Sequence, residues 1–257
     1  MNYLDVAISA ANEAGKIHLK YFQTDIQIET KTTPFDLVTI ADTESEQIIV
    51  GAIRKYFPEH NFLAEENNYE KTNSEFTWII DPLDGTNNFA SGLPIFCTSI
   101  ALAKKDELIL GVIYDATRDE LFWAEKDKGS FLNGKPIRVT SQESLQDSIL
   151  ITGFYYDRGE YMERTLDNIR NFFTKRIRGL RRLGAAALDL CYIASGRASG
   201  FWEFRLSPWD FAAGKLLVEE AGGKVTNQKG EEVNPNNPSY IVASNAKIHQ
   251  AMLSVLR

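Results

Sequence analysis

The spacing of apolar residues predicts an alternation of helices and strands in the first third of the chain. Apolar residues recur every three or four positions over residues 3–22, which are expected to form an amphipathic helix. The same period predicts a second helix over residues 42–57, and Pro58 ends it because proline cannot continue a helix. Short apolar runs at 61–63 and 77–80 predict two strands, and acidic residues follow both runs.

The middle of the chain has mostly the pattern of strands, and the second half returns to alternation. Asn133-Gly134 is flanked by apolar residues and predicts a hairpin. The segment 129–136 also matches the phosphate-loop pattern G-x-x-x-x-G-K, but Pro136 replaces the Ser or Thr of that pattern, so the hairpin is the better interpretation. Alternation around a β-rich middle favours an α/β protein of stacked layers over a single barrel. The further strands are expected at 98–103, 108–114, 121–124, 200–204 and 240–243, with a basic strand near 175–182, and the further helices at 161–173, 185–194, 208–221 and 246–256.

The composition narrows the classes of protein that the chain can represent. Its 257 residues are 44% hydrophobic and 25% charged, which excludes a disordered or collagen-like chain. The 28 Lys and Arg against 35 Asp and Glu give a net charge of −7, which disfavours wholesale binding of nucleic acid or of an anionic membrane. Cys97 and Cys191 lie far apart without metal or disulfide spacing, and no apolar run is long enough to span a bilayer. We therefore expect a soluble, cytoplasmic protein.

The motif with the clearest chemistry is Asp81-Pro-Leu-Asp84-Gly85-Thr86, directly after an apolar strand. Two carboxylates held in one turn repel each other by roughly 4 kcal/mol at about 4 Å and an effective dielectric of about 20. A hard divalent cation between them relieves that repulsion, which indicates Mg²⁺ or Mn²⁺. Gly85 and Thr86 then begin a helical turn, whose free N–H groups suit a phosphate. The alternative interpretation is an ordinary Pro-Asp-Gly loop.

Three other acidic positions have an ordinary structural explanation when each is taken alone. Glu65 follows a short strand and fits a solvated loop. Asp42 fits the beginning of the second helix. Asp210 lies three residues after Ser207, with proline between them, which fits a capping box. Metal binding by Asp210 is the functional alternative, and the local sequence does not choose between the two.

The sequence shows no constellation for nucleophilic catalysis by a side chain. The three histidines are scattered without ligand spacing, and no G-x-S-x-G motif is present. The run 175–182 carries five positive charges in eight residues and could collect an anionic substrate. In an acidic protein, however, a solvated or subunit-facing strand is the simpler interpretation of that run.

Together these residues resemble the inositol monophosphatase family of Mg²⁺-dependent, lithium-sensitive phosphatases, over nearly the whole chain. The resemblance implies an α-β-α-β-α sandwich, usually a homodimer, with one domain over 1–257. Within it, 1–150 would carry the D-P-x-D-G-T site and 151–257 the W-D site. The resemblance rests on Glu65-Glu66 ahead of Trp78-Ile-Ile-Asp81-Pro-Leu-Asp84-Gly-Thr86, and on Trp209-Asp210-x-Ala-Ala-Gly214 followed by Glu220-Ala-Gly-Gly.

The resemblance also implies metal ligands. Two to three Mg²⁺ ions are expected, with Mn²⁺ as a substitute and Li⁺ as an inhibitor. Glu65, Asp81 and the Leu83 carbonyl would hold one ion, and Asp81, Asp84 and Asp210 the second. Glu65 would help to place a third, weaker ion through water.

Matching residues receive catalytic and substrate-binding roles in the same way. Thr86 and Asp42 would orient the attacking water, with Glu65 acting beside them. Backbone N–H groups of Gly85 and Thr86 would hold the phosphate. The residues expected to contact the substrate are Asp84, Gly85, Thr86, Gly184, Ala185, Ala186, Glu203 and Asp210.

The substrate that represents the family best is myo-inositol 1-phosphate, which would be hydrolysed to myo-inositol and phosphate by metal-activated water. Relatives act on fructose 1,6-bisphosphate, histidinol phosphate, NADP or adenosine 3′,5′-bisphosphate. Arg205 stands where many inositol-type relatives carry Gly, and its guanidinium could recruit a second phosphate, so fructose-1,6-bisphosphatase activity is the alternative. A non-catalytic, metal-dependent binding module is an alternative of another class, although all of the expected acidic ligands are present.

Overall fold

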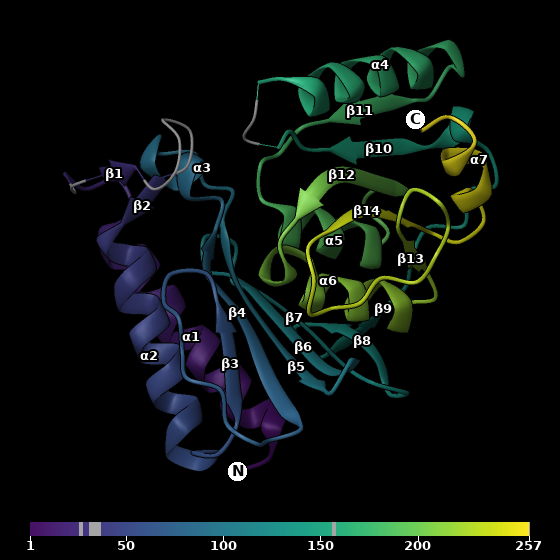
Figure 1. Cartoon of the computed structure of the whole chain (residues 1–257). Helices are drawn as coiled ribbons and strands as arrows, with labels where there is room; N and C mark the ends of the chain where they lie inside the picture. Colours follow the sequence, from purple (N-terminus) through teal and green to yellow (C-terminus); the bar gives the residue numbers. More distant parts are fainter. Residues whose placement is uncertain (26–27, 31–36, 156–157, 257) are drawn as a thin grey trace.

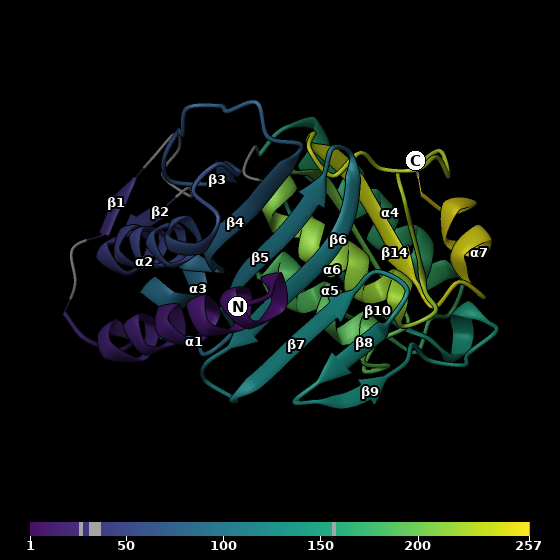
Figure 2. The same cartoon turned by 90° about the horizontal axis from the view of Figure 1, so that it is seen from below.

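Helices and sheets alternate as layers through the molecule (Figure 1). The computed structural model describes residues 1–25, 28–30, 37–155 and 158–256. Figure 2 shows the first helices in front of the larger sheet and the middle helices behind it. This arrangement confirms the stacked layers that the sequence pattern predicts and the α-β-α-β-α order that the family resemblance implies. The layers are, in order, α1 (Tyr3–Tyr21) with α2 (Ile40–Tyr56), a seven-stranded sheet, α5 (Ala186–Ala194) with α6 (Pro208–Glu220), a five-stranded sheet, and α4 (Glu160–Thr174) with α7 (His249–Leu253).

The larger sheet contains the strands of the middle of the chain, in sequence order from β3 to β9. β3 and β4 are parallel, and every later pair is antiparallel. The hairpin at Asn133-Gly134 is confirmed, and both residues have positive φ, as this turn requires. The strands are β3 (Asn61–Ala64), β4 (Phe76–Asp84), β5 (Cys97–Lys104), β6 (Glu107–Asp115), β7 (Glu120–Glu125), β8 (Gly129–Leu132) and β9 (Lys135–Ile137).

The smaller sheet has the order β11-β10-β12-β14-β13 and mixes parallel and antiparallel pairs. β10 is parallel to β11 and β12, whereas β14 is antiparallel to β12 and β13. The sequence pattern missed β10 and β13, because three or four residues are too few to show a period. The strands are β10 (Ile149–Thr152), β11 (Gly179–Arg181), β12 (Gly200–Leu206), β13 (Lys224–Thr226) and β14 (Ser239–Ser244), and a separate two-stranded sheet pairs β1 (Ile28–Thr30) with β2 (Leu37–Thr39).

Two predicted elements differ in extent from the observed ones. The basic strand expected near 175–182 is limited to β11, because Arg176 has φ +59 and turns the chain after α4. The last helix was expected over 246–256, but α7 covers only His249–Leu253. Ala246 has φ +67, which a right-handed helix does not allow, so the helix begins after it.

Three apolar clusters fill the spaces between neighbouring layers. One cluster joins α1 and α2 to the larger sheet around Trp78, and another joins α4 and α7 to the smaller sheet around Trp202. The largest cluster surrounds α5 and α6, which are packed between the two sheets. Close approach there needs small residues. A Cβ on Gly111 of β6 would lie 2.8 Å from the Ala213 carbonyl oxygen of α6.

Candidate active site

β4 places two carboxylates at its end. The strand continues through Asp84, further than the sequence pattern predicts, and its pairing with β5 shifts in register between Asp81 and Asp84. Both side chains are buried, with 2% and 9% of their surface exposed, and Asp81 Oδ1 accepts a hydrogen bond of 3.0 Å from the Leu83 N–H. Local turn geometry therefore brings the two acids close together.

The helix α3 (Thr86–Ala90) begins directly after these acids, as the sequence predicts. Gly85 has φ +94, a conformation that favours glycine, and a Cβ there would lie 2.8 Å from the carbonyl oxygen of Ile95. The tight turn at Gly85 therefore fixes where the first residues of α3 lie relative to Asp81 and Asp84.

Asp84 also connects the larger sheet to α5. Its Oδ2 accepts a hydrogen bond of 2.7 Å from the Ala187 N–H, and the Ala186 N–H also donates to this carboxylate. Gly184 and Ala185 lie just before this helix, with Gly184 at φ +91. The segment expected to contact the substrate is thus brought to Asp84 from a distance of about a hundred residues in sequence.

Asp42 and Thr86 are in direct contact. The Thr86 hydroxyl lies 2.9 Å from Asp42 Oδ1 and 3.0 Å from the carbonyl oxygen of Leu83. Asp42 Oδ2 accepts from both the N–H and the hydroxyl of Thr39, each at 2.7 Å, so it also caps α2. Burial raises the pKa of Asp42 to about 6, against the hydrogen bonds from Thr39 and Thr86. The structural role of Asp42 therefore uses one oxygen and its contact with Thr86 the other.

The two carboxylate oxygens of Asp210 also differ in their contacts. Its Oδ2 accepts a hydrogen bond of 2.7 Å from the Ser207 N–H, so the capping box at the beginning of α6 is present. The second oxygen takes no part in that bond. The structural and functional interpretations of Asp210 are thus compatible, because each requires a different oxygen.

Glu65 is positioned by a buried acid that the sequence analysis missed. Glu46, on the inner face of α2, accepts hydrogen bonds from the Glu66 N–H at 2.9 Å and from Asn67 and Tyr69 at 2.8 Å each. The Glu65 N–H donates to the carbonyl oxygen of Ile80 on β4, at 3.2 Å. The only signal in the sequence was an acidic residue on the apolar side of a predicted helix.

The four expected carboxylate ligands lie within electrostatic reach of one another. Burial raises the pKa of Asp81 well above its usual range, and the charges of Glu65, Asp84 and Asp210 raise it further. Burial likewise raises the pKa of Asp84 to about 7 and that of Asp210 well above its usual range, with Glu65 adding to both. Within the described residues, the groups that most affect the pKa values of these three aspartates include no Lys or Arg side chain.

This donor set fits a divalent cation in its chemistry. Buried carboxylates without a cationic neighbour are stabilised by a hard metal ion that accepts oxygen ligands. Within the described ranges, no three His, Cys, Asp or Glu side chains already stand in the arrangement of a closed metal site. The donors are therefore gathered, and binding of an ion requires their side chains to adjust.

Glu203 lies on the smaller sheet at the edge of this cluster. Burial raises its pKa to about 8, the charge of Arg182 lowers it, and that of Asp84 raises it. A Cβ on Gly153 would lie 1.9 Å from Glu203 Oε2, so a larger residue there would displace this carboxylate. Asp189 also senses Glu203 and Arg182, and its buried Oδ1 has no hydrogen-bond partner in the described part of the chain.

The sequence analysis missed Gly153, Asp189 and the position of Arg182. It treated Arg182 as part of a solvated basic run. The structure places the guanidinium of Arg182 beside Gly184, where Nη1 would lie 2.1 Å from a Cβ. A basic side chain thus accompanies Glu203 and Asp189 next to the segment expected to bind substrate.

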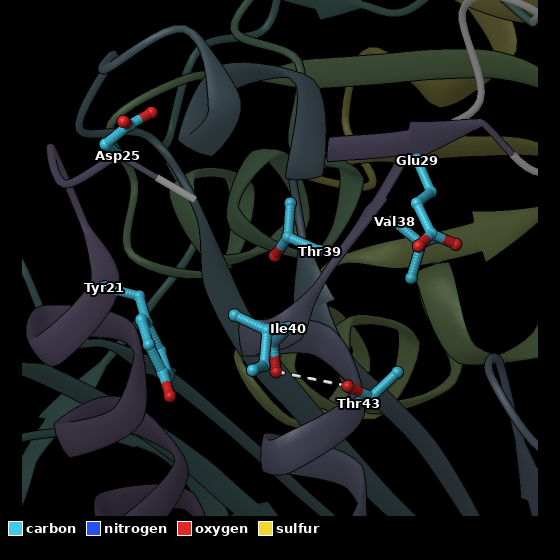
Figure 3. A pocket seen from close by; sticks show the side chains of 7 residues that line it. All are labelled: Tyr21, Asp25, Glu29, Val38, Thr39, Ile40 and Thr43. Atoms are coloured by element: carbon cyan, nitrogen blue, oxygen red, sulfur yellow. Dashed lines mark hydrogen bonds between the residues drawn. The ribbon is translucent and has the colours of Figure 1, made fainter. Parts of the chain in front are cut away.

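A cavity of about 450 Å³ lies at the beginning of α2. Figure 3 shows its lining side chains, with Thr39 and Ile40 between Tyr21 and Asp25 on one side and Glu29 and Val38 on the other. The Thr43 hydroxyl donates to the carbonyl oxygen of Ile40 at 3.2 Å. None of the expected site residues lines it, so the cavity neighbours the site through Thr39 rather than containing it. Its lining residues are Tyr21, Asp25, Glu29, Val38, Thr39, Ile40 and Thr43.

Comparison with known proteins gives full-length matches. The sequence model of the inositol monophosphatase family matches residues 2–257. A protein of Salmonella typhimurium named "Nus factor SuhB" is 41% identical over 99% of this chain and 95% of its own. The "Fructose-1,6-bisphosphatase/inositol-1-monophosphatase" of Thermotoga maritima is 39% identical over 100% of this chain and 96% of its own.

Solved structures show the same arrangement. The extragenic suppressor protein suhB of Bartonella henselae superposes with a TM-score of 0.91 at 37% identity, covering 99% of this chain and 98% of that chain. An IMPase/NADP phosphatase complexed with Mg²⁺ and phosphate superposes with a TM-score of 0.87 at 26% identity, covering 98% of this chain and 94% of that one.

Proposed function

Because the chain belongs to the inositol monophosphatase family and is a phosphatase, we propose that it hydrolyses a small phosphomonoester with the help of Mg²⁺, with myo-inositol 1-phosphate as the representative substrate. The observation that carries this proposal is that the charge of Glu65 raises the pKa of the buried Asp81, Asp84 and Asp210, which come from β4 and from the beginning of α6.

In this proposal the metal ligands are those that match the family. Glu65, Asp81 and the carbonyl oxygen of Leu83 would hold one ion, and Asp81, Asp84 and Asp210 a second, with a third, weaker ion near Glu65. When bound, Mg²⁺ lowers the pKa of a coordinated water and stabilises charge on the phosphoryl group and the leaving oxygen. Mn²⁺ would substitute, and Li⁺ would inhibit.

The residues of the chain would orient water and phosphate. The Thr86 hydroxyl donates toward Asp42, which leaves the Thr86 oxygen with lone pairs that can accept a hydrogen from the attacking water. The backbone N–H groups of Gly85 and Thr86, at the beginning of α3, would bind the phosphate oxygens. Gly184, Ala185, Ala186 and Glu203 would contact the alcohol part of the substrate.

A panel of phosphate-release assays tests the proposal. The substrates are myo-inositol 1-phosphate, fructose 1,6-bisphosphate, histidinol phosphate, NADP and adenosine 3′,5′-bisphosphate, each with and without Mg²⁺ and Li⁺. We expect Mg²⁺-dependent turnover that Li⁺ suppresses and that Asp84→Asn abolishes while the circular dichroism spectrum is retained. Asp167→Asn is the matched control, because Asp167 is an exposed acid of α4 that forms an ion pair with its helical neighbour Arg170. Turnover that is unaffected by Asp84→Asn would contradict the proposal.

Fructose 1,6-bisphosphate is the second candidate substrate. The Thermotoga maritima relative has that activity in its name, and Arg205 supplies an exposed cation on the strand that carries Glu203.

We also propose a homodimer, on the ground of the family resemblance. Within the described residues, no helix is both long enough and apolar enough to cross a membrane. Size-exclusion chromatography with light scattering measures the mass directly, and a monomer at the working concentration would contradict the dimer.

A further inference from the structure

Arg205 occupies an unusual place in the backbone. Its φ is +51, and the pairing of β12 with β14 shifts in register between Glu203 and Leu206. A left-handed conformation costs a residue with a Cβ roughly 1–2 kcal/mol, and such strain is concentrated at functional sites. The chain therefore keeps an arginine where glycine would be easier to accommodate.

Two tyrosine rings hold the side chain of Arg205. Its guanidinium carbon lies 5.2 Å from the ring centre of Tyr155 and 5.9 Å from that of Tyr161. The two rings are nearly perpendicular to each other, at 85°, and together they restrict where the guanidinium lies. A preorganised fork of donors on an exposed side chain suits a phosphate.

The charge of Arg205 is not compensated by an acidic side chain of the described residues. The arginines that form ion pairs there are Arg118, Arg164, Arg170, Arg178 and Arg197. Arg182, the other arginine near Glu203, faces the carboxylates of Glu203 and Asp189 and lowers the pKa of both. Of these two arginines, Arg205 is therefore the one whose positive charge is available to bind an anion.

Arg205 also lies close to the candidate site along the chain. It follows Glu203 by two residues, which is at most about 7 Å of chain, and the charge of Asp84 raises the pKa of Glu203. For a substrate whose reacting phosphate lies at the Asp81–Thr86 turn and whose body lies at Glu203, Arg205 is the exposed cation nearest to Glu203 along β12.

We infer that Arg205 is a specificity-determining residue that receives the second phosphate of a polyol phosphorylated at both ends, of the class of fructose 1,6-bisphosphate. This inference rests on the proposed function. In the reaction, the bond between phosphorus and the leaving oxygen breaks, a bond from phosphorus to the water oxygen forms, and a proton of that water passes to the leaving oxygen. The phosphate at Arg205 is not altered.

The test compares fructose 1,6-bisphosphate with myo-inositol 1-phosphate in three proteins. Arg205→Gly removes the guanidinium and relieves the positive φ, so the variant is expected to fold. Arg205→Lys keeps the charge without the planar fork. Arg176→Gly is the matched control, because Arg176 is also exposed and has φ +59. It precedes β11, which is parallel to β10 and β12, so it lies where these strands begin, whereas Arg205 lies near the end of β12.

We expect Arg205→Gly to lower kcat/KM for the bisphosphate by about 10- to 100-fold, the range for losing a charge-assisted hydrogen bond, and to affect the monophosphate far less. Arg205→Lys should recover part of the loss, and Arg176→Gly should change neither substrate. An equal change for both substrates, no change, or a wild type that hydrolyses only the monophosphate would overturn the inference and leave the proposed function standing. A wild type that hydrolyses none of the phosphomonoesters with Mg²⁺ would overturn both.

Discussion

The imidazole of His18 donates a hydrogen bond from Nε2 to the carbonyl oxygen of Pro82, across 2.9 Å, and so connects α1 to the turn between Asp81 and Asp84. A carbonyl oxygen can only accept, so Nε2 carries the hydrogen. Nδ1 is buried and has no hydrogen-bond partner among the described residues, which leaves its lone pair unsatisfied. Burial lowers the pKa of His18 from 6.5 to about 4, because a proton on Nδ1 would have no acceptor.

This histidine predicts a loss of stability in acid. The unfolded chain binds a proton below pH 6.5 and the folded chain only below about pH 4. The free energy of unfolding should therefore fall as the pH drops through that window, by about 1.4 kcal/mol per pH unit and roughly 3 kcal/mol in all. His18→Gln keeps an N–H donor but cannot be protonated. The free energy of unfolding, measured in urea at a series of pH values, should therefore depend on pH less steeply in this variant, by the contribution of one proton. His249 shifts similarly in both proteins and cancels in the comparison. Equal slopes would contradict this account.

Replacing Gly85 should cost more than the strain of a positive φ. Gly85→Ala forces a Cβ to within 2.8 Å of the Ile95 carbonyl oxygen, whereas Gly222 has a similar φ of +87 and open space around it. We expect Gly222→Ala to lower the free energy of unfolding by about 1 kcal/mol, and Gly85→Ala to lower it further and reduce turnover. Urea unfolding of both variants measures the difference, and equal losses would show that the contact with Ile95 is harmless.

Thr86 should act through its hydroxyl. Thr86→Val removes the donor to Asp42 with little change of volume and should lower kcat by about 10²- to 10⁴-fold, the usual range for loss of a proton-transfer group. Thr86→Ser keeps the hydroxyl and should retain most of the activity. If the serine variant is as inactive as the valine variant, the methyl group rather than the hydroxyl is what matters.

Removing one carboxylate should separate stability from metal binding. Asp81 is buried against the charges of Glu65, Asp84 and Asp210, so Asp81→Asn should raise the Tm measured in EDTA. Mg²⁺ should raise the Tm of the wild type by mass action and leave that of the variant unchanged. Asp167→Asn should respond to Mg²⁺ like the wild type. A variant that Mg²⁺ still stabilises fully would remove Asp81 from the ligand set.

Gly153 should control the placement of Glu203. Gly153→Ala puts a Cβ on the Glu203 carboxylate and should raise KM for myo-inositol 1-phosphate, whereas Gly51→Ala meets no atom within 4 Å. Gly51 lies inside α2, so its replacement should stabilise the protein by about 0.5–1 kcal/mol and leave the kinetics unchanged. An unchanged KM in Gly153→Ala would mean that Glu203 does not contact the substrate.

Sequence reasoning succeeded where the signal was local. The turn from Asp81 to Thr86, the following helix and the Asn133-Gly134 hairpin all depend on residues within a few positions of one another. The alternation of helices and strands predicted the layers, and the motifs around Asp81 and Asp210 identified the family by resemblance. By contrast, Glu46 acts on residues some twenty positions away, and Gly153 makes room for a side chain fifty positions later. Such pairings exist only after the sheets have formed, so no window of sequence displays them.

Asp210 illustrates a different limit. The local sequence offered a helix cap or a metal ligand as alternatives, whereas the structure shows that the cap uses one oxygen and leaves the other out of that bond. Asp42 divides its oxygens in the same manner. Sequence patterns treat a side chain as one unit, so they do not reveal that a carboxylate can serve two purposes.

The bond from Asp84 to the first amides of α5 has a mechanical consequence. A strand of the larger sheet and a helix of the middle layer are held by the carboxylate that the reaction would also use, and Glu203 faces it from the smaller sheet. A ligand that contacts all of these elements would oppose sliding of one sheet past the other. A bound ligand would therefore restrict relative motion of the layers, and release of the product would allow that motion again.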